Sequence, residues 1–180
     1  MKKILVAAMA ATLLSSVAAG QTSPAAADIM KEARQLAAKE NKNILILFTA
    51  SWCGWCHKMD KSLNDSTCKT FFDDNFVIRH MVVDETKEKK HLETAGGAAM
   101  KKQYYGEGTG IPFWLVFDKE GNLLADSKIR KEGEGPQQGE NTGCPATEEE
   151  VNYFIAVLKR TSRMNDGQLE IVRKRFRRNE

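Results

Sequence analysis

The sequence predicts an α/β protein in which helices cover both faces of one central mixed sheet of four to five strands. Helix and strand patterns alternate along the chain, ending in two consecutive strands and a helix. The run ILILFT, from Ile44 to Thr49, has the length and the unbroken apolar character of a strand buried on both faces. A length of 180 residues, with 42% hydrophobic and 28% charged residues, suits one globular domain.

The first half of the chain is predicted to form two strands and three helical stretches. Asp28 can cap a helix that runs to about Glu40, and its apolar face would hold Ile29, Ala33, Leu36 and Ala37. After the ILILFT strand, residues 57–63 are predicted to be helical. Ser66 can cap a further helical stretch, and residues 76–84 form the second strand.

Residues 85–97 are charged and then rich in glycine, so they predict an exposed insertion. The short helix after it, residues 98–105, is expected to stop at Gly106. Strands 113–117 and 123–129 are joined by a hairpin turn in which Gly121 supplies the positive φ.

The C-terminal part begins with a long loop, residues 131–146, which is rich in Gly, Gln, Glu and Pro. Thr147 and Glu150 have the spacing of a capping box for a helix that runs to about Arg160. A last helix spans about residues 167–177. Its basic tail, Arg173 to Arg178, is expected to be a solvated helix end, with a partner contact as the alternative.

The N-terminus has the pattern of a secretory signal peptide over residues 1–20. Lys2 and Lys3 precede an apolar run at residues 4–14, and small residues lead to a cleavage point near Ala19 or Gly20. The run is too short to span a bilayer, so no permanent membrane anchor is expected. We therefore expect an exported protein, periplasmic or secreted, although a buried N-terminal helix is the alternative.

The predicted organisation is a signal peptide at residues 1–20, a flexible lead at 21–27, one domain at 28–160 and a helical extension at 161–180. Cleavage removes Lys2 and Lys3 from the 27 basic residues, which leaves 25 against 24 acidic ones. A nearly neutral protein gives no electrostatic case for binding nucleic acid.

Two of the four cysteines, Cys53 and Cys56, have the spacing of a redox-active pair at the start of a helix. Backbone N–H groups and the helix dipole there favour a thiolate on the first cysteine and lower its pKa. A thiolate attacks a substrate disulfide, and the second thiol resolves the mixed disulfide. Cys53 is therefore the expected nucleophile and Cys56 the expected resolving residue, with no cofactor beyond their disulfide.

Three other interpretations of this pair stay open. A zinc site needs a second pair of ligands at close spacing, and Cys68 and Cys144 are isolated from each other, so no metal is expected. The Cys53-to-His57 segment also matches a c-type haem attachment pattern, with Met59, Met81 and Met100 as candidate axial ligands. The third interpretation is an inert structural disulfide, although a junction beside Trp52 suits one poorly.

The segment from Phe48 to Met59, FTASWCGWCHKM, resembles the active site of the thioredoxin-like superfamily, above all that of exported domains with a Trp-Cys-x-Trp-Cys core. A second landmark is Gly110-Ile111-Pro112-Phe113, because in that family this proline is cis and lies beside the cysteines. The resemblance covers about residues 28–160. It implies a thioredoxin fold with an insertion before the cis-proline, and a thiol–disulfide oxidoreductase. The implied substrate-binding residues are Trp52, Gly54, Trp55, Ile111 and Pro112.

The chain departs from the family pattern in its proton-handling residues. Where the family has a buried acid this chain has Leu47, and the family's partner lysine falls at His80. His57 and His80 are candidate proton partners, since histidine titrates near neutral pH. The alternative is that both are ordinary surface or half-buried histidines.

Two further departures concern the insertion and the extra cysteines. The insertion between Asp84 and Ile111 is a candidate for shaping substrate access, or else a tolerated surface loop. Cys68 and Cys144 are candidates for a structural disulfide that pins the 131–146 loop, or else two small buried residues.

The resemblance favours a reductase that exchanges electrons with the thiols or disulfides of protein substrates and with an upstream donor or acceptor protein. An oxidase or an isomerase would use the same atoms at a different potential. The alternative from another class is a non-catalytic module that binds client proteins at the cis-proline groove.

Overall fold

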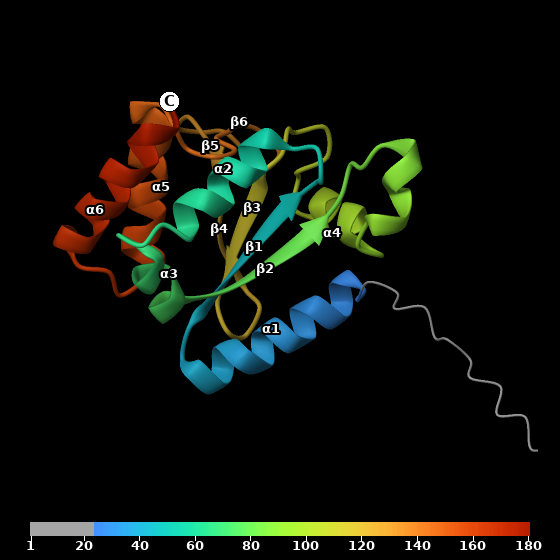
Figure 1. Cartoon of the computed structure of the whole chain (residues 1–180), viewed down its shortest axis with the longest axis horizontal. Helices are drawn as coiled ribbons and strands as arrows, with labels where there is room; N and C mark the ends of the chain where they lie inside the picture. The colour runs from blue at the N-terminus through green and yellow to red at the C-terminus, as the bar shows by residue number, and fades with distance from the viewer. Residues whose placement is uncertain (1–23) are drawn as a thin grey trace, which may run out of the picture.

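The computed structural model describes residues 24–180, and it shows a four-stranded mixed sheet with helices on both faces (Figure 1). The strand order is β2-β1-β3-β4. β1 (Asn43–Thr49) is parallel to β2 (Phe76–Val82) and antiparallel to β3 (Phe113–Phe117), which pairs with β4 (Leu123–Asp126). The predicted α/β class and mixed sheet are confirmed.

The predicted signal peptide lies outside the described residues, as do residues 21–23 of the predicted lead. The lead is also shorter than predicted, because residues 26 and 27 already belong to the first helix. Within residues 24–180, no helix has the length and apolar character needed to cross a membrane.

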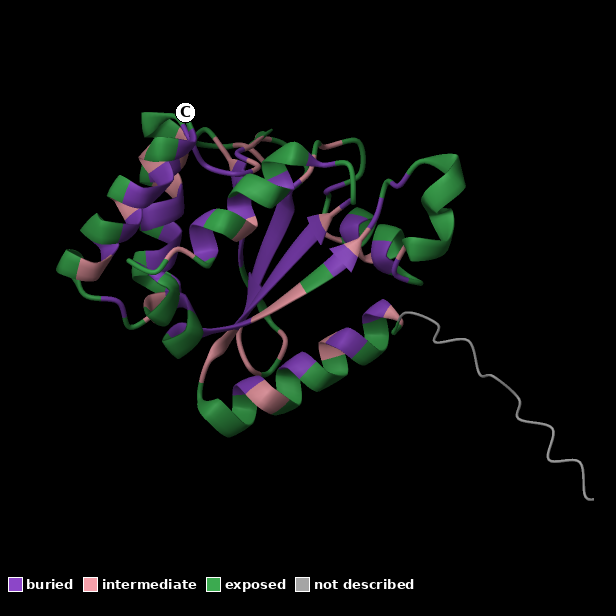
Figure 2. Cartoon of the chain, viewed as in Figure 1, coloured by how far each residue is buried: buried purple, intermediate pink, exposed green. Residues whose placement is uncertain are grey.

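β1 and its neighbour β3 are the two deeply buried strands of the sheet (Figure 2). Five consecutive residues, Ile44 to Phe48, are at most 2% exposed. Because side chains alternate along a strand, Leu45 and Leu47 join the hydrophobic cluster on one face, while Ile44, Ile46 and Phe48 join the other. The unbroken apolar run therefore reflects burial on both faces, as predicted.

The helices divide between the two faces. α1 (Ala26–Glu40) and α4 (Gly97–Gln103) pack on one side. The other side carries α2 (Gly54–Leu63), α3 (Lys69–Asn75), α5 (Glu148–Thr161) and α6 (Asp166–Phe176). The capping box predicted at Thr147 and Glu150 is present at the start of α5.

Two predicted helix caps are wrong. α1 begins at Ala26 with Ala25 as its N-cap, so Asp28 lies inside the first turn. A carboxylate there still stabilises the helix through its interaction with the helix dipole. α3 begins at Lys69 rather than behind Ser66. The Asp65 carboxylate accepts both the backbone N–H and the hydroxyl of Thr67, and this local turn uses the residues that a cap would need.

The second half of the sheet differs in detail from the prediction. The strand expected at 123–129 is interrupted at Ser127, whose hydroxyl lies between the backbone N–H of Trp114 and the Asn141 side chain. The chain then forms a separate ribbon, β5 (Lys128–Ile129) with β6 (Glu140–Asn141). The stretch 131–146 is thus a loop that carries a short strand.

The insertion is also more ordered than a simple exposed loop. It contains the 3₁₀ helix η1 (Lys87–Leu92), and Glu85 and Thr94 are buried at its two ends. After α4 the chain turns at Gly106, whose N–H bonds to the Lys101 carbonyl. A Cβ at Gly106 would lie 2.7 Å from the Phe113 ring, which explains the glycine there.

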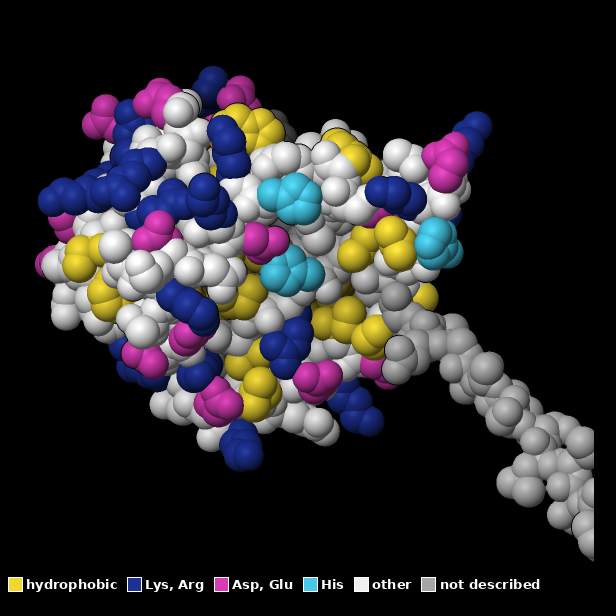
Figure 3. Space-filling view, viewed as in Figure 1, with side chains coloured by type: hydrophobic (Ala, Val, Ile, Leu, Met, Phe, Trp, Pro, Cys, Tyr) yellow, Lys and Arg dark blue, Asp and Glu magenta, His cyan; other side chains and the backbone are white. Residues whose placement is uncertain are grey.

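The C-terminal extension belongs to the same core as the domain before it. Phe176 is fully buried, with its ring centroid 4.9 Å from that of Phe154 and 6.2 Å from that of Phe72. Lys and Arg side chains gather over this end of the molecule (Figure 3). One of them, Arg175, is buried and its Nε donates to Asp65 Oδ2 at 2.6 Å, so the basic tail is only partly solvated.

We expect Asp65 to make folding sensitive to acid. Hydrogen bonds from Thr67, together with Arg175, lower the pKa of Asp65 from 3.8 to about 2. A carboxylate whose pKa is lower in the folded state stabilises the fold above the unfolded pKa, and this contribution is lost as the pH falls from about 4 to about 2.

The free energy of unfolding is measured in urea at several pH values between about 5 and about 2. As the pH falls, it should decrease less steeply for Asp65→Asn than for the unchanged protein. Asp74→Asn, which changes the same charge on the exposed surface of α3, is the control. Equal pH slopes for Asp65→Asn and the unchanged protein would contradict the expectation.

Candidate functional site

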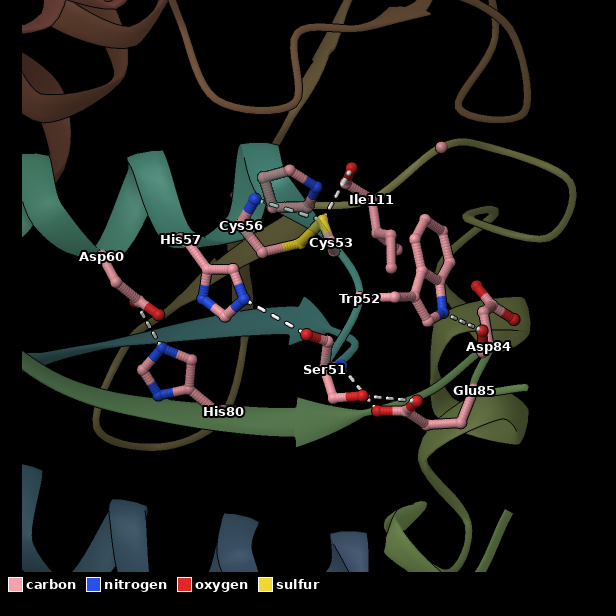
Figure 4. The surroundings of a disulfide bond; sticks show 12 residues. Ser51, Trp52, Cys53, Cys56, His57, Asp60, His80, Asp84, Glu85 and Ile111 are labelled. Atoms are coloured by element: carbon pink, nitrogen blue, oxygen red, sulfur yellow. Dashed lines mark hydrogen bonds and ion pairs between the residues drawn. A yellow bond between two sulfur atoms is a disulfide. The ribbon is translucent and has the colours of Figure 1, made fainter. Parts of the chain in front are cut away.

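The site lies where β1 gives way to α2, and Cys53 and Cys56 form a disulfide there with an S–S distance of 2.01 Å (Figure 4). Cys53 is the N-cap of α2, and its Sγ accepts a hydrogen bond from the Cys56 N–H at 3.1 Å. Once the disulfide is reduced, that N–H and the helix dipole would stabilise a thiolate on Cys53. Among residues 24–180, no hydrogen bond to Cys56 Sγ is present, so the geometry distinguishes the two sulfurs.

Two exposed indoles flank the buried disulfide. Trp52 is 55% exposed and Trp55 is 47% exposed, whereas Cys53 and Cys56 are only 3% and 2% exposed. Gly54 between them is also exposed. The surface that a large partner would meet first is therefore aromatic, with the sulfurs directly beneath it.

The second landmark from the sequence lies against the first. Ile111 packs on Cys53, Cys56 and Ala50, and its carbonyl oxygen lies 3.5 Å from Cys53 Sγ. The Ile111–Pro112 peptide bond is cis. The pairing of Phe48 with Phe113 across β1 and β3 explains this meeting, because it brings the start of β3 to the end of β1.

An acidic residue that the sequence analysis missed holds the loop before Cys53. The Glu85 carboxylate accepts the Ser51 N–H at 2.5 Å and the Ser51 hydroxyl at 3.0 Å. These hydrogen bonds lower the pKa of Glu85, so it is a carboxylate at neutral pH. Lys89, from the insertion, also donates to the Ser51 hydroxyl.

The neighbouring indole is held from the same segment. Trp52 Nε1 donates to the Asp84 carbonyl oxygen at 2.9 Å. Asp84 in turn accepts at its carboxylate from Lys101, whose buried ammonium also donates to the Thr109 carbonyl. Lys101 thereby joins Asp84, at the start of the segment between β2 and the cis-proline, to Thr109 near its end. Trp52 connects the same segment to the disulfide loop, so the segment is part of the framework of the site.

A third segment reaches the site from β6. Asn141 Nδ2 donates to the carbonyl oxygens of Gly110 and Pro112, at 2.8 Å and 3.1 Å. Asn141 thus holds the chain on both sides of Ile111.

The two histidines lie near the site with different partners. His80 Nε2 is 2.7 Å from Asp60 Oδ1, and His57 Nε2 is 3.2 Å from the Ser51 carbonyl oxygen (Figure 4). Both contacts require a proton on Nε2, since a carboxylate and a carbonyl can only accept. Leu47 pairs with His80 across β1 and β2, but its own side chain is buried in an apolar cluster.

Of the two alternatives for Cys68 and Cys144, the disulfide is wrong, and the structure shows two free, buried cysteines. Cys68 Sγ donates to the Ser62 carbonyl oxygen, while Cys144 Sγ accepts from Asn179 Nδ2. Burial raises the pKa of both thiols, to about 12 for Cys144, so both stay protonated at neutral pH. The loop end at Cys144 is pinned by hydrogen bonds instead.

The fold and the site agree with the comparison that decides the family. A family model described as thioredoxin-like matches residues 25–119, more than half of the chain. The chain belongs to the thioredoxin-like family. Its mixed four-stranded sheet with helices on both faces is a thioredoxin fold, and its Cys53–Cys56 disulfide occupies the position expected for the family's redox pair.

The chain is also similar, at low identity, to several solved structures. A disulphide isomerase from Xylella fastidiosa Temecula1 is 20% identical over 64% of this chain and 80% of its own, with a TM-score of 0.47. An oxidoreductase named DsbH is 23% identical over 85% and 95%, with a TM-score of 0.43. The C-terminal domain of DsbD from Neisseria meningitidis, in its oxidised form, is 20% identical over 77% and 97%, with a TM-score of 0.42. No curated protein matches the chain.

Glu85 and Asn141 are site residues that the sequence analysis missed, and only Glu85 lies at a position from which its role could have been predicted. It follows the second strand directly, and the carboxyl ends of the parallel strands β1 and β2 meet at one edge of the sheet. Asn141 lies in a polar loop with no pattern that separates it from its neighbours.

We expect Glu85→Ala to release the loop before Cys53. Removing the carboxylate leaves the Ser51 N–H without its acceptor, and loss of a hydrogen bond to a charged group costs about 1.5–3 kcal/mol. Hydrogen exchange at the Ser51 amide should therefore speed up by about tenfold or more. Glu88→Ala, in the same insertion, is the control, and equal exchange rates in Glu85→Ala and the unchanged protein would refute the expectation.

Proposed function

We propose that the protein is a thiol–disulfide oxidoreductase that reduces disulfides in protein substrates, with Cys53 as nucleophile and Cys56 as resolving residue. The observation that carries the proposal is the hydrogen bond from the Cys56 N–H to Cys53 Sγ at the N-terminus of α2. It favours the thiolate on the cysteine that must attack. The disulfide that joins the two sulfurs supports this chemistry over thioether attachment of a haem, which would need each sulfur separately.

The reaction follows from the two sulfurs. The Cys53 thiolate attacks one sulfur of a substrate disulfide, and the other substrate sulfur leaves as a thiolate and takes up a proton. Cys56, after losing its proton, attacks Cys53 Sγ and releases the second substrate thiol. Two electrons have then passed to the substrate, and the Cys53–Cys56 disulfide has formed. A dithiol protein acting as upstream donor returns the pair to the reduced state.

Substrate binding is proposed for the aromatic surface and the cis-proline segment. Trp52 and Trp55 offer exposed apolar area beside the sulfurs, and Gly54 leaves room between them. Ile111 packs against the disulfide beside Trp52 (Figure 4), so a peptide bound at Ile111 would have its disulfide close to Cys53. The N-terminal signal pattern supports a periplasmic or secreted place of action.

The first experiment is a trap for the mixed disulfide. Cys56→Ser should accumulate a covalent complex between Cys53 and a protein disulfide substrate such as insulin, because no second thiol can release it. Cys53→Ser should form no complex and should have no insulin-reducing activity. Turnover that survives Cys53→Ser, or an unchanged protein that binds insulin without reducing it, would contradict the proposal and favour a client-binding module.

The direction of electron flow is tested on the same preparations. Equilibration of the unchanged protein with glutathione gives the reduction potential of the pair. A value near about −270 mV, typical of thioredoxin, is expected for a reductase, and one near about −120 mV would instead indicate an oxidase.

We propose that a histidine takes the Cys56 proton, and His80 is the first candidate because it pairs across β1 and β2 with Leu47, the position of the family's buried acid. The partner of His80, Asp60, follows Cys56 by one turn on α2. Asp60 holds the His80 ring against α2, whereas His57 is bound to the Ser51 carbonyl.

His80→Ala should therefore move the titration of the Cys56 thiol, followed by thiolate absorbance in the Cys53→Ser background, to higher pH, and His57→Ala should move it less. His91→Ala, on η1, is the control. Identical titrations in the His57 and His80 variants and the unchanged background would exclude both residues as proton partners.

A further inference from the structure

Asn179 is a buried polar residue, with 4% of its surface exposed. It ends the 3₁₀ helix η2 (Arg177–Asn179) that follows α6. Its side-chain Nδ2 donates to Cys144 Sγ and to the Pro145 carbonyl oxygen, at 3.3 Å and 3.2 Å. Its Oδ1 accepts from the Ser62 hydroxyl at 3.1 Å and from Arg175 at 3.2 Å. The side chain thus joins α2, α6 and the loop before α5.

The backbone of the same residue reaches the disulfide site. The Asn179 carbonyl oxygen accepts a hydrogen bond from Lys58 Nζ at 3.1 Å. Lys58 is exposed on α2, and its Nζ also lies 4.1 Å from the centroid of the Trp55 ring. This distance is that of a cation–π contact, in which the ammonium is attracted to the ring face. A lysine side chain has many rotamers, so two partners at once restrict where its charge lies.

We propose that Asn179 is a positioning residue for substrate recognition: it holds the Lys58 ammonium on the Trp55 ring and so orders the exposed surface beside the disulfide. The inference rests on the proposed thiol–disulfide exchange with protein substrates. A protein partner that covers Trp55 would bind a surface already arranged, and less side-chain freedom would be lost on binding. The chain end, far from Cys53 in sequence, would then contribute to affinity for large substrates without touching the reacting sulfurs.

The kinetic test compares Lys58→Met, Asn179→Ala and their combination, with insulin as the protein disulfide substrate. Each single variant should raise the KM for insulin by about threefold, the size expected from an exposed cation–π contact, and leave kcat unchanged. The double variant should have the KM of Lys58→Met alone, because Asn179 acts through Lys58. The KM for bis(2-hydroxyethyl) disulfide, which is too small to cover Trp55, should not change.

Lys61→Met is the matched control, since Lys61 is an exposed lysine one turn further along α2. A KM for insulin that is unchanged in Lys58→Met overturns the inference, and so does a double variant whose effects simply add. If Asn179→Ala does not fold, Lys58→Met decides, because it leaves the side-chain contacts of Asn179 in place. An unchanged protein that does not reduce insulin overturns both the inference and the proposed function.

A second measurement separates positioning from a general loss of stability. In the folded, reduced protein, Asn179→Ala should shift the indole N–H resonance of Trp55, assigned with Trp55→Phe, and leave that of Trp52 in place. The reason is that the Lys58 ammonium leaves the Trp55 ring, whereas Trp52 is bound to Asp84. An unshifted Trp55 resonance in a folded Asn179→Ala variant overturns the inference.

Discussion

β1 pairs with β2 along one edge and β3 along the other, and apolar clusters cover both of its faces. The pairing register of such a strand is fixed, because a shift by one residue would move every side chain to the opposite face of the sheet. The end of β1 is therefore a rigid point, and the disulfide follows it within a few residues. The pairing of Thr49 with Val82 brings the segment after β2 to Ser51, and the pairing of Phe48 with Phe113 brings Ile111 to Cys53. The register of the sheet thus assembles the site from three separate parts of the chain.

Apart from the cis-proline beside the cysteines, which the family resemblance implied, the features that were predictable from the sequence are those with a local physical cause. The apolar run at residues 44–49 gave β1, and the Thr147–Glu150 spacing gave the cap of α5. Asn141 and Asn179 could not be found in this way, since each acts through partners about thirty or more residues away along the chain. The same limit explains the wrong disulfide, because an even number of cysteines carries no information on which buried sulfurs point toward each other.

Replacement of the family's buried acid by Leu47 changes where charge lies around the disulfide. Leu47 joins Met59 and Leu63 in an apolar layer under α2, which would make a buried carboxylate there costly. The acidic groups lie instead at the rim, with Asp60 against His80 and Glu85 against Ser51. Proton transfer at this site would therefore run toward the surface of the molecule, where exchange with water does not require opening the core.

The insertion and the C-terminal extension act on the disulfide from opposite sides. The insertion holds Trp52, the residue before Cys53, through the Asp84 carbonyl. The extension holds Lys58 against Trp55, the residue before Cys56, through the Asn179 carbonyl. Each exposed indole thus has its own support, supplied by a different segment of the chain. Large aromatic side chains contribute most to recognition when they are ordered before a partner arrives. Two separate supports would allow the surface beside Cys53 and the surface beside Cys56 to be adapted independently to a partner, while the sulfur geometry set by β1 and α2 stays the same.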